Sequence, residues 1–282
     1  MTIGTSAEGA KARFGSEAYR RLRANGFDCV DFNLADTDTV YYTAPEAQAI
    51  ALLQAEVAHI HAAGMTVSQI HGPWRWPPQD GTLAQFFERQ DKMRRSLRLA
   101  AAVGCPLWVV HPVMPFGIEE LGTPRADDTW MVNLAFFTPL VEEAKALGVT
   151  ICLENMPMPQ FSLGTPQETL RLARALGVKL CLDTGHVAVY GGALDLAQAV
   201  RDAGDDLKAL HLHDNDGVRD THRLPFMGIC NWKRFAAALK EIGFDGTLSA
   251  ETEPPALLPP PAWEAVSRAI AQMLLHLQTL AN

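Results

Sequence analysis

Short runs of apolar and β-branched residues alternate with longer helical stretches along the whole chain, and this alternation limits the fold more than any other feature. Several helical stretches end at a glycine just before the next run, as at Gly148 and Gly177. Glycine after a helix supplies the left-handed conformation that turns the chain back. The short runs predict seven clear strands, at Cys29–Leu34, Thr66–His71, Leu107–His111, Thr150–Asn155, Lys179–Asp183, Lys208–His213 and Thr247–Glu251.

An unbroken strand–helix order at this spacing predicts a parallel sheet with right-handed crossovers. A weaker first strand near Met1–Thr5 brings the number of units to eight. We therefore expect an α/β fold in which residues 1–282 form a single domain, a (β/α)8 TIM barrel. An open doubly wound sheet is the alternative, but neither GxGxxG nor GxxxxGK[ST] follows the first strands, which disfavours its nucleotide-binding form. The proline-rich residues 254–263 predict a loop before the last helix.

Composition narrows the class of protein. Of the 282 residues, 48% are hydrophobic and 20% are charged, as expected for a soluble globular domain. The net charge of −8, without a long Lys/Arg run, disfavours a general nucleic-acid binder. Five cysteines without a CxxC pair predict free thiols in a reducing compartment. With neither an N-terminal signal core nor a run of ~20 apolar residues, we expect a cytoplasmic protein that does not contact membranes.

Histidines and carboxylates stand where the predicted strands end. The functional face of a (β/α)8 barrel lies at the C-terminal ends of its strands, so side chains at these positions converge. A single such residue is more often a helix cap or a hydrogen-bonded structural group. Six successive strands that all end in a histidine or a carboxylate need another explanation, because clustered carboxylates at a barrel mouth repel one another. The strand-end residues are His71, His111, Glu154, Asp183, His213 and Glu251, with His186 shortly after Asp183.

A divalent cation resolves this repulsion, because it neutralises two or three carboxylates at once. A mixed set of carboxylate oxygens and imidazole nitrogens, without a thiolate, suits Mn²⁺, Mg²⁺, Co²⁺ or Zn²⁺. We expect Mn²⁺ first among these ions. The absence of a nearby cysteine ligand disfavours a structural zinc site of the cysteine type.

The motifs at the strand ends also resemble those of a known family. In order along the chain they are HGPW (71–74), VVHP (109–112), LENMP (153–157), LDTGH (182–186), HLHDND (211–216), DTH (220–222) and AETE (250–253). This order and spacing is similar to that of the xylose isomerase-like TIM barrel superfamily, which includes sugar phosphate isomerases and epimerases and nucleases of the AP endonuclease family 2 type. The resemblance covers nearly the whole chain.

The resemblance implies a metal-dependent sugar isomerase or epimerase that acts on a ketose, or on a related sugar acid or polyol. The implied metal ligands are Glu154, Asp183, His213 and Glu251, with His211 as the alternative to His213. Glu154 and Glu251 would also transfer the proton next to the substrate carbonyl. The residues expected to contact the sugar are His71, Trp74, His111, His186, Arg219, Asp220 and His222. A homodimer or homotetramer is common in the superfamily.

Two other activities remain open at this point. An endonuclease IV-like apurinic-site phosphodiesterase would hold three zinc ions, and each of its ligand positions is occupied by a suitable residue here. The acidic net charge favours the sugar enzyme and argues against nucleic acid as a partner. An inosose-type dehydratase, which would use the same enolisation, is the other alternative. The aromatic residues Trp74, Trp76 and Phe116 follow His71 and His111 and predict an apolar wall at the mouth.

Overall fold

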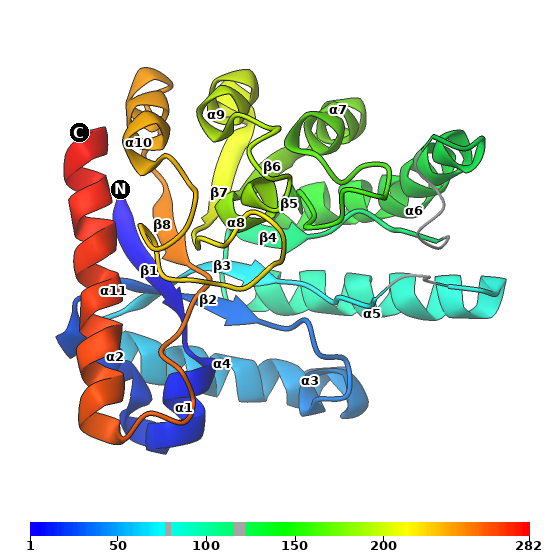
Figure 1. Ribbon diagram of the computed structural model, residues 1–282. Helices are drawn as coiled ribbons and strands as arrows, with labels where there is room; N and C mark the ends of the chain where they lie inside the picture. The colour runs from blue at the N-terminus through cyan, green and yellow to red at the C-terminus, as the bar shows by residue number, and fades with distance from the viewer. Residues whose placement is uncertain (77–79, 116–121) are drawn as a thin grey trace.

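The computed structural model describes residues 1–76, 80–115 and 122–282. Within these ranges, eight parallel strands form a barrel with helices packed around it, which confirms the predicted (β/α)8 fold (Figure 1). The strands are β1 (Thr2–Ser6), β2 (Cys29–Asn33), β3 (Thr66–His71), β4 (Leu107–Val110), β5 (Thr150–Glu154), β6 (Lys179–Asp183), β7 (Leu207–His211) and β8 (Thr247–Ala250).

The barrel closes just beyond the ends of β7 and β8. The strands hydrogen-bond in the order β7-β6-β5-β4-β3-β2-β1-β8, and a parallel bridge between Leu212 and Ala250 joins the two edges. The backbone N–H of Leu212 donates to the carbonyl of Ser249 at 2.8 Å, and the N–H of Glu251 donates to the carbonyl of Leu212 at 3.1 Å. This closure rules out the open sheet and brings the ends of all eight strands into one ring.

Helices lie between the strands and cover the barrel, as the predicted strand–helix order requires. The larger ones are α4 (Glu46–Ala62), α5 (Leu83–Ala102), α6 (Arg125–Leu147), α7 (Pro166–Leu176), α9 (Leu196–Ala203), α10 (Trp232–Glu241) and α11 (Pro260–Ala281). The sequence did not predict α1 (Glu8–Phe14), α2 (Ala18–Asn25), α3 (Val40–Thr43) or α8 (Thr184–Ala188), nor the 3-10 turns η1 (Gly15–Glu17) and η2 (Gly204–Asp206).

The proline-rich segment differs from its prediction as one continuous loop. Helix α11 already begins at Pro260, inside residues 254–263. Proline fits the first turn of a helix, because the N–H it lacks would have no partner there and its φ is already helical. The same rule places Pro166 at the start of α7, where the Thr165 and Glu168 side chains form a capping box.

The two ends of the chain lie side by side, where α11 packs beside β1 (Figure 1). The side-chain amide of Gln278 donates to the carbonyl of Met1 at 2.6 Å. Among the described residues, no helix combines the length and the apolar character needed to cross a membrane.

Inside the barrel, one compact group of side chains is apolar and fully buried: Val109, Cys152, Cys181 and Ala209. All five cysteines of the chain are free thiols, as predicted. Two positions further along the same strands stand His111, Glu154, Asp183 and His211. Because side chains alternate across a strand, residues two apart face the same side. The apolar group is therefore the floor on which a polar layer rests.

Candidate active site and metal centre

The predicted strand-end residues meet at one end of the barrel. His71 closes β3, Glu154 closes β5 and Asp183 closes β6, while His111 and Glu251 directly follow β4 and β8. His213 lies two residues beyond the end of β7, next to the bridge that closes the barrel. The C-terminal ends of the strands therefore hold the whole predicted set, as the barrel geometry requires.

One group of four residues brings its possible metal-ligating atoms together. It differs from the predicted ligand set by holding His211 in place of His213. Ligand atoms of Glu154, Asp183, Glu251 and His211 all lie within 4.8 Å of one another. His213 instead groups with Asp183 and His186, and its Nε2 lies 3.1 Å from Asp183 Oδ1. Three of the four predicted ligands thus converge directly, and the choice between His211 and His213 depends on which ring nitrogen is free.

Buried polar atoms without a hydrogen bond show which side chains have an atom free to bind an ion. Glu154 Oε2, Asp183 Oδ2, His213 Nε2 and Glu251 Oε2 are buried and accept or donate no hydrogen bond within the described chain. A buried polar atom without a partner costs about 1–3 kcal/mol. All four predicted ligands carry such an atom, whereas both ring nitrogens of His211 are hydrogen-bonded to carboxylates, those of Glu154 and Asp31. The residues present therefore fit a divalent ion, and they fit one with His213 better than one with His211.

The LDTGH motif prepares the space for the His213 ring. Gly185 lies so close to this ring that a Cβ at position 185 would overlap it. Thr184 holds the same residue by its backbone, donating to the carbonyl of His213 at 2.7 Å and accepting from its N–H at 3.1 Å. Gly185 and Thr184 of this motif thus set the position of His213.

The motifs LEN and LDTGH are also joined to each other. The side chain of Asn155 accepts from the N–H of Asp183 at 2.9 Å and donates to its carbonyl at 3.1 Å. Asp183 Oδ1 accepts the N–H of His186 at 2.6 Å. His186 Nδ1 donates to the carbonyl of Asn155 at 2.7 Å, so its Nε2 faces Asp220 Oδ2, 3.4 Å away. His186 is therefore oriented towards the cavity with a defined ring nitrogen.

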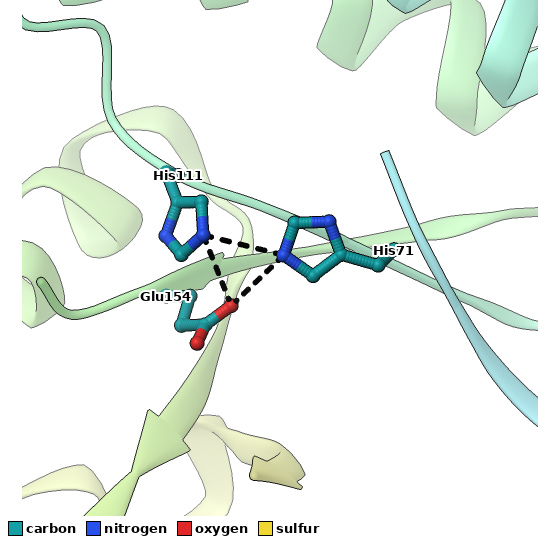
Figure 2. Close-up of side chains that lie close together, drawn as sticks. All are labelled: His71, His111 and Glu154. Carbon is teal, nitrogen blue, oxygen red and sulfur yellow. Dashed lines mark hydrogen bonds and ion pairs between the residues drawn. The ribbon is translucent and has the colours of Figure 1, made fainter. Parts of the chain in front are cut away.

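A second group of possible ligands lies on the other side of Glu154. Figure 2 shows His71 Nε2, His111 Nε2 and Glu154 Oε2 pointing at one another, with separations of 3.2 to 3.6 Å. His71 Nδ1 donates to the carbonyl of Gly72 at 2.8 Å, which leaves its Nε2 with a lone pair. His111 Nδ1 is buried without a hydrogen bond in the described chain. These three residues offer ligand atoms within 4.8 Å of one another, as a bound cation requires.

Asp220 and His222 approach the predicted ligands from the loop after β7. The ring of His222 stacks on that of His213 with centroids 4.0 Å apart, and its Nε2 lies 3.2 Å from Asp220 Oδ2. His222 Nδ1 donates to the carbonyl of Glu251 at 2.6 Å. Its φ of 44° is in the left-handed region, which is unusual for a residue with a side chain and typical of functional sites.

Burial and neighbouring charges move the pKa values of these groups apart. Burial raises the pKa of Asp183, and it lowers the pKa of His111 to about 3. Burial also opposes the charge on Glu154 and Glu251, but His211 outweighs it and lowers the pKa of both carboxyls. For His186, the carboxylates of Asp183 and Asp220 overcome burial and raise the pKa to about 9. Neighbouring groups with opposite shifts are typical of active sites.

A cavity of about 650 Å³ opens above these groups. Trp74 lines it and packs edge-on against His111, with ring centroids 4.7 Å apart. Trp76 also lines the cavity and is 70% exposed, whereas Phe116 lies outside the described residues. Glu251 lines the cavity, and Glu154, Asp183 and His213 are fully buried beneath it. The described lining residues include no lysine or arginine.

Arg219 is the predicted site residue that the structure does not bring to the cavity. Its side chain is 77% exposed and lies 3.7 Å from Asp216. Conversely, Asp31 lines the cavity and contacts His211, although the sequence did not single it out. The only available signal was an acidic residue in the otherwise apolar run CVDF (29–32), where side chains alternate between the barrel interior and the helices.

The chain resembles known proteins in sequence and in structure. Residues 19–274 match the family described as xylose isomerase-like TIM barrel. An uncharacterized protein of Methanocaldococcus jannaschii is 32% identical over 193 residues, which cover 65% of this chain and 64% of that protein. The chain thus spans about two thirds of that relative. The crystal structure of a D-tagatose 3-epimerase-like protein, 22% identical, has a TM-score of 0.74 and covers 100% of this chain and 98% of its own. A D-psicose 3-epimerase, 15% identical, has a TM-score of 0.77 and covers both chains fully.

Proposed function

Because the chain belongs to the xylose isomerase-like TIM barrel family, we propose that it is a divalent-metal-dependent isomerase or epimerase of a ketose or a related sugar acid or polyol. One observation carries this proposal above the others. Four residues at the barrel mouth, Glu154, Asp183, His213 and Glu251, each hold a buried atom without a hydrogen bond in the described chain. They lie at the base of a cavity large enough for a small ligand.

The chemistry follows from the two glutamates. A divalent ion held by the four residues would polarise the substrate's carbonyl and make the neighbouring carbon-bound proton more acidic. The lowered pKa values of Glu154 and Glu251 keep both carboxyls ionised and able to accept a proton. One ionised glutamate would remove the proton from carbon, and the other, once it has taken up a proton from water, would deliver that proton to the opposite face and invert the stereocentre. Delivery to the adjacent carbon would move the carbonyl instead.

Other groups around the cavity would bind and orient the sugar. His186 Nε2 and Asp220 face the cavity and can hydrogen-bond to hydroxyl groups. Trp74, Met156 and Met158 form an apolar surface against which one face of a sugar ring or chain can pack. The absence of lysine and arginine from the described lining suits an uncharged sugar better than a phosphorylated one.

Metal analysis combined with isotope exchange tests this proposal. We expect about one divalent ion per chain, with Mn²⁺ giving the highest activity. Incubation with a set of ketoses in D₂O should place deuterium at the carbon next to the carbonyl, detected by loss of the ¹H NMR signal. A metal-loaded protein that exchanges no carbon-bound proton in any ketose, sugar acid or inosose would exclude the proposed activity.

The alternative of a three-metal phosphodiesterase has support from one specific observation. Besides the central group, the structure gathers His71, His111 and Glu154 on one side and His213, Asp220 and His222 on the other. Multi-metal sites of this kind activate water for phosphodiester cleavage. About three metal ions per chain, with cleavage of a DNA strand at an abasic position, would favour this activity. About one ion and no cleavage would exclude it.

A further inference from the structure

Beside the predicted ligands lies a buried pair that the proposed mechanism does not use. Asp31 on β2 and His211 on β7 meet inside the barrel, with Asp31 Oδ2 at 2.9 Å from His211 Nε2. In the strand order, β1 and β8 stand between β2 and β7, so the contact reaches across the barrel interior. The Asp31 and His211 side chains are only 9% and 1% exposed.

Two further strands hold Asp31 in place. The amide of Gln69 on β3 donates to Asp31 Oδ2 at 2.7 Å, and the hydroxyl of Ser249 on β8 donates to the same oxygen at 3.2 Å. The pairing of β2 with β3 shifts register between Val30 and Asp31. Such irregularities re-aim a side chain, and here the shift occurs at the residue that reaches His211.

The other nitrogen of His211 faces both glutamates of the proposed reaction. Its Nδ1 donates to Glu154 Oε1 at 2.9 Å and lies 3.1 Å from Glu251 Oε2. The hydrogen bond occupies Oε1 of Glu154 and leaves Oε2 of this residue unpaired. One imidazole therefore sets which oxygen of Glu154 is available and how far apart the two carboxylates stand.

Stability alone does not account for this arrangement. Replacing a buried ion pair by well-packed apolar residues is often neutral or stabilising. The barrel can hold an apolar layer, because Cys152, Cys181 and Ala209 on β5, β6 and β7 fill the next layer down. A polar pair that bridges the barrel at the level of the predicted ligands therefore calls for a role other than stabilising the fold, and contact with these ligands points to their orientation.

We propose that Asp31 is a positioning residue that acts through His211, orienting Glu154 so that its free oxygen faces the divalent ion and holding the carboxylate of Glu251 beside it. This inference rests on the proposed function in one respect, namely that the two glutamates are metal ligands. Residues that orient metal ligands in this way typically change metal affinity or activity 10–100-fold when they are replaced.

The substitution Asp31→Asn keeps the size of the side chain and removes its charge. We expect Mn²⁺ affinity, measured by titration calorimetry, to fall about 10–100-fold. The visible absorption of the Co²⁺-loaded protein should change as well, because it reports the geometry of the ligands. The matched control is Asp80→Asn, the same exchange at a buried carboxylate that pairs with Arg89 at 2.8 Å outside the site. The control should leave both readouts unchanged.

A double substitution shows whether Asp31 acts through His211. If it does, Asp31→Asn combined with His211→Asn should weaken Mn²⁺ binding no more than His211→Asn alone, because residues that act as a unit are not additive. A second variant guards against misfolding of Asp31→Asn. Ser249→Ala removes one hydrogen bond to Asp31 and should lower Mn²⁺ affinity about fivefold.

The outcomes separate this inference from the proposed function. A wild-type protein that binds Mn²⁺ but exchanges no substrate proton would exclude the isomerase and leave the positioning role supported by the affinity and the Co²⁺ spectrum. Asp31→Asn and Ser249→Ala proteins that keep wild-type Mn²⁺ affinity and an unchanged Co²⁺ spectrum would overturn the positioning role alone. Additive losses in the double variant would overturn it too. A wild-type protein that binds no divalent ion would overturn both.

Discussion

Two layers of side chains inside the barrel come from neighbouring positions of the same strands and have opposite properties. The lower layer is Val109, Cys152, Cys181 and Ala209, and it is apolar and closely packed. The upper layer, two residues further along each strand, contains His111, Glu154, Asp183 and His211 and holds several atoms without hydrogen bonds in the described chain. The lower layer stabilises the fold by burial, whereas the upper layer bears a desolvation cost that a bound cation would offset.

The largest expected effect comes from the glutamates of the upper layer. Glu154→Gln or Glu251→Gln removes a proposed proton acceptor and a proposed metal-binding charge, and turnover of the ketose that takes up deuterium should fall about 10²–10⁴-fold. In the presence of chelator, each variant should unfold below the wild-type temperature, because the lowered pKa of both carboxyls means that the fold stabilises their ionised form; turnover is therefore measured on folded protein. Glu264→Gln, at a glutamate on α11 that pairs with Arg21, is the control. Wild-type turnover in either active-site variant would contradict the assignment.

Metal binding should stabilise the upper layer by the next largest amount. A ligand that binds only the folded state at 100 times its Kd adds about 2.7 kcal/mol to the free energy of unfolding. Urea unfolding with Mn²⁺ or with chelator measures this difference. Asp183→Asn should abolish most of it, since Asp183 is a member of the central ligand group. Equal stability of the wild-type protein in the two solutions would show that the upper layer is not a metal site.

The lower layer should respond in the opposite way. Val109→Ala removes two buried methyl groups and should lower the free energy of unfolding by about 2 kcal/mol. Its kcat/KM, measured on folded protein, and its stabilisation by Mn²⁺ should both stay close to wild type. A large loss of turnover at an unchanged folded fraction would mean that the two layers are mechanically coupled rather than separable.

The sequence was sufficient for the fold and for the end of the barrel at which the site lies. Strand ends can be located from residue patterns, and in a parallel barrel all strand ends meet. This is why His71, Glu154, Asp183 and Glu251 could be brought together before the structure was known. Short helices such as α1 and α3 were missed, because one or two turns of helix give too little periodicity to detect.

The contacts within the site could not be obtained from the sequence. Strand β7 ends at His211, and an isolated bridge at Leu212 follows it. The alternation of side chains along a strand therefore does not tell which carboxylate oxygens His211 and His213 contact. Barrel closure was predicted, but the partnership of Asp31 with His211 also depends on a register shift between β2 and β3, which leaves no pattern in the sequence. The structure supplies these two facts, and the assignment of His213 as a metal ligand stays a prediction.

The smallest effect is expected at Arg219, which tests how far the upper layer extends into the loops. The side chain is 77% exposed and 3.7 Å from Asp216, so any contact with substrate is made at the rim of the cavity. Exposed charged contacts contribute about 0.2–1 kcal/mol, and Arg219→Ala should therefore raise KM about threefold and leave the turnover rate unchanged. Arg223→Ala, at the neighbouring arginine 3.4 Å from the same aspartate, is the control for the loop. If Arg219→Ala alone slowed turnover by about two orders of magnitude, as the loss of a catalytic group does, this loop would have to close over the substrate and belong with the upper layer.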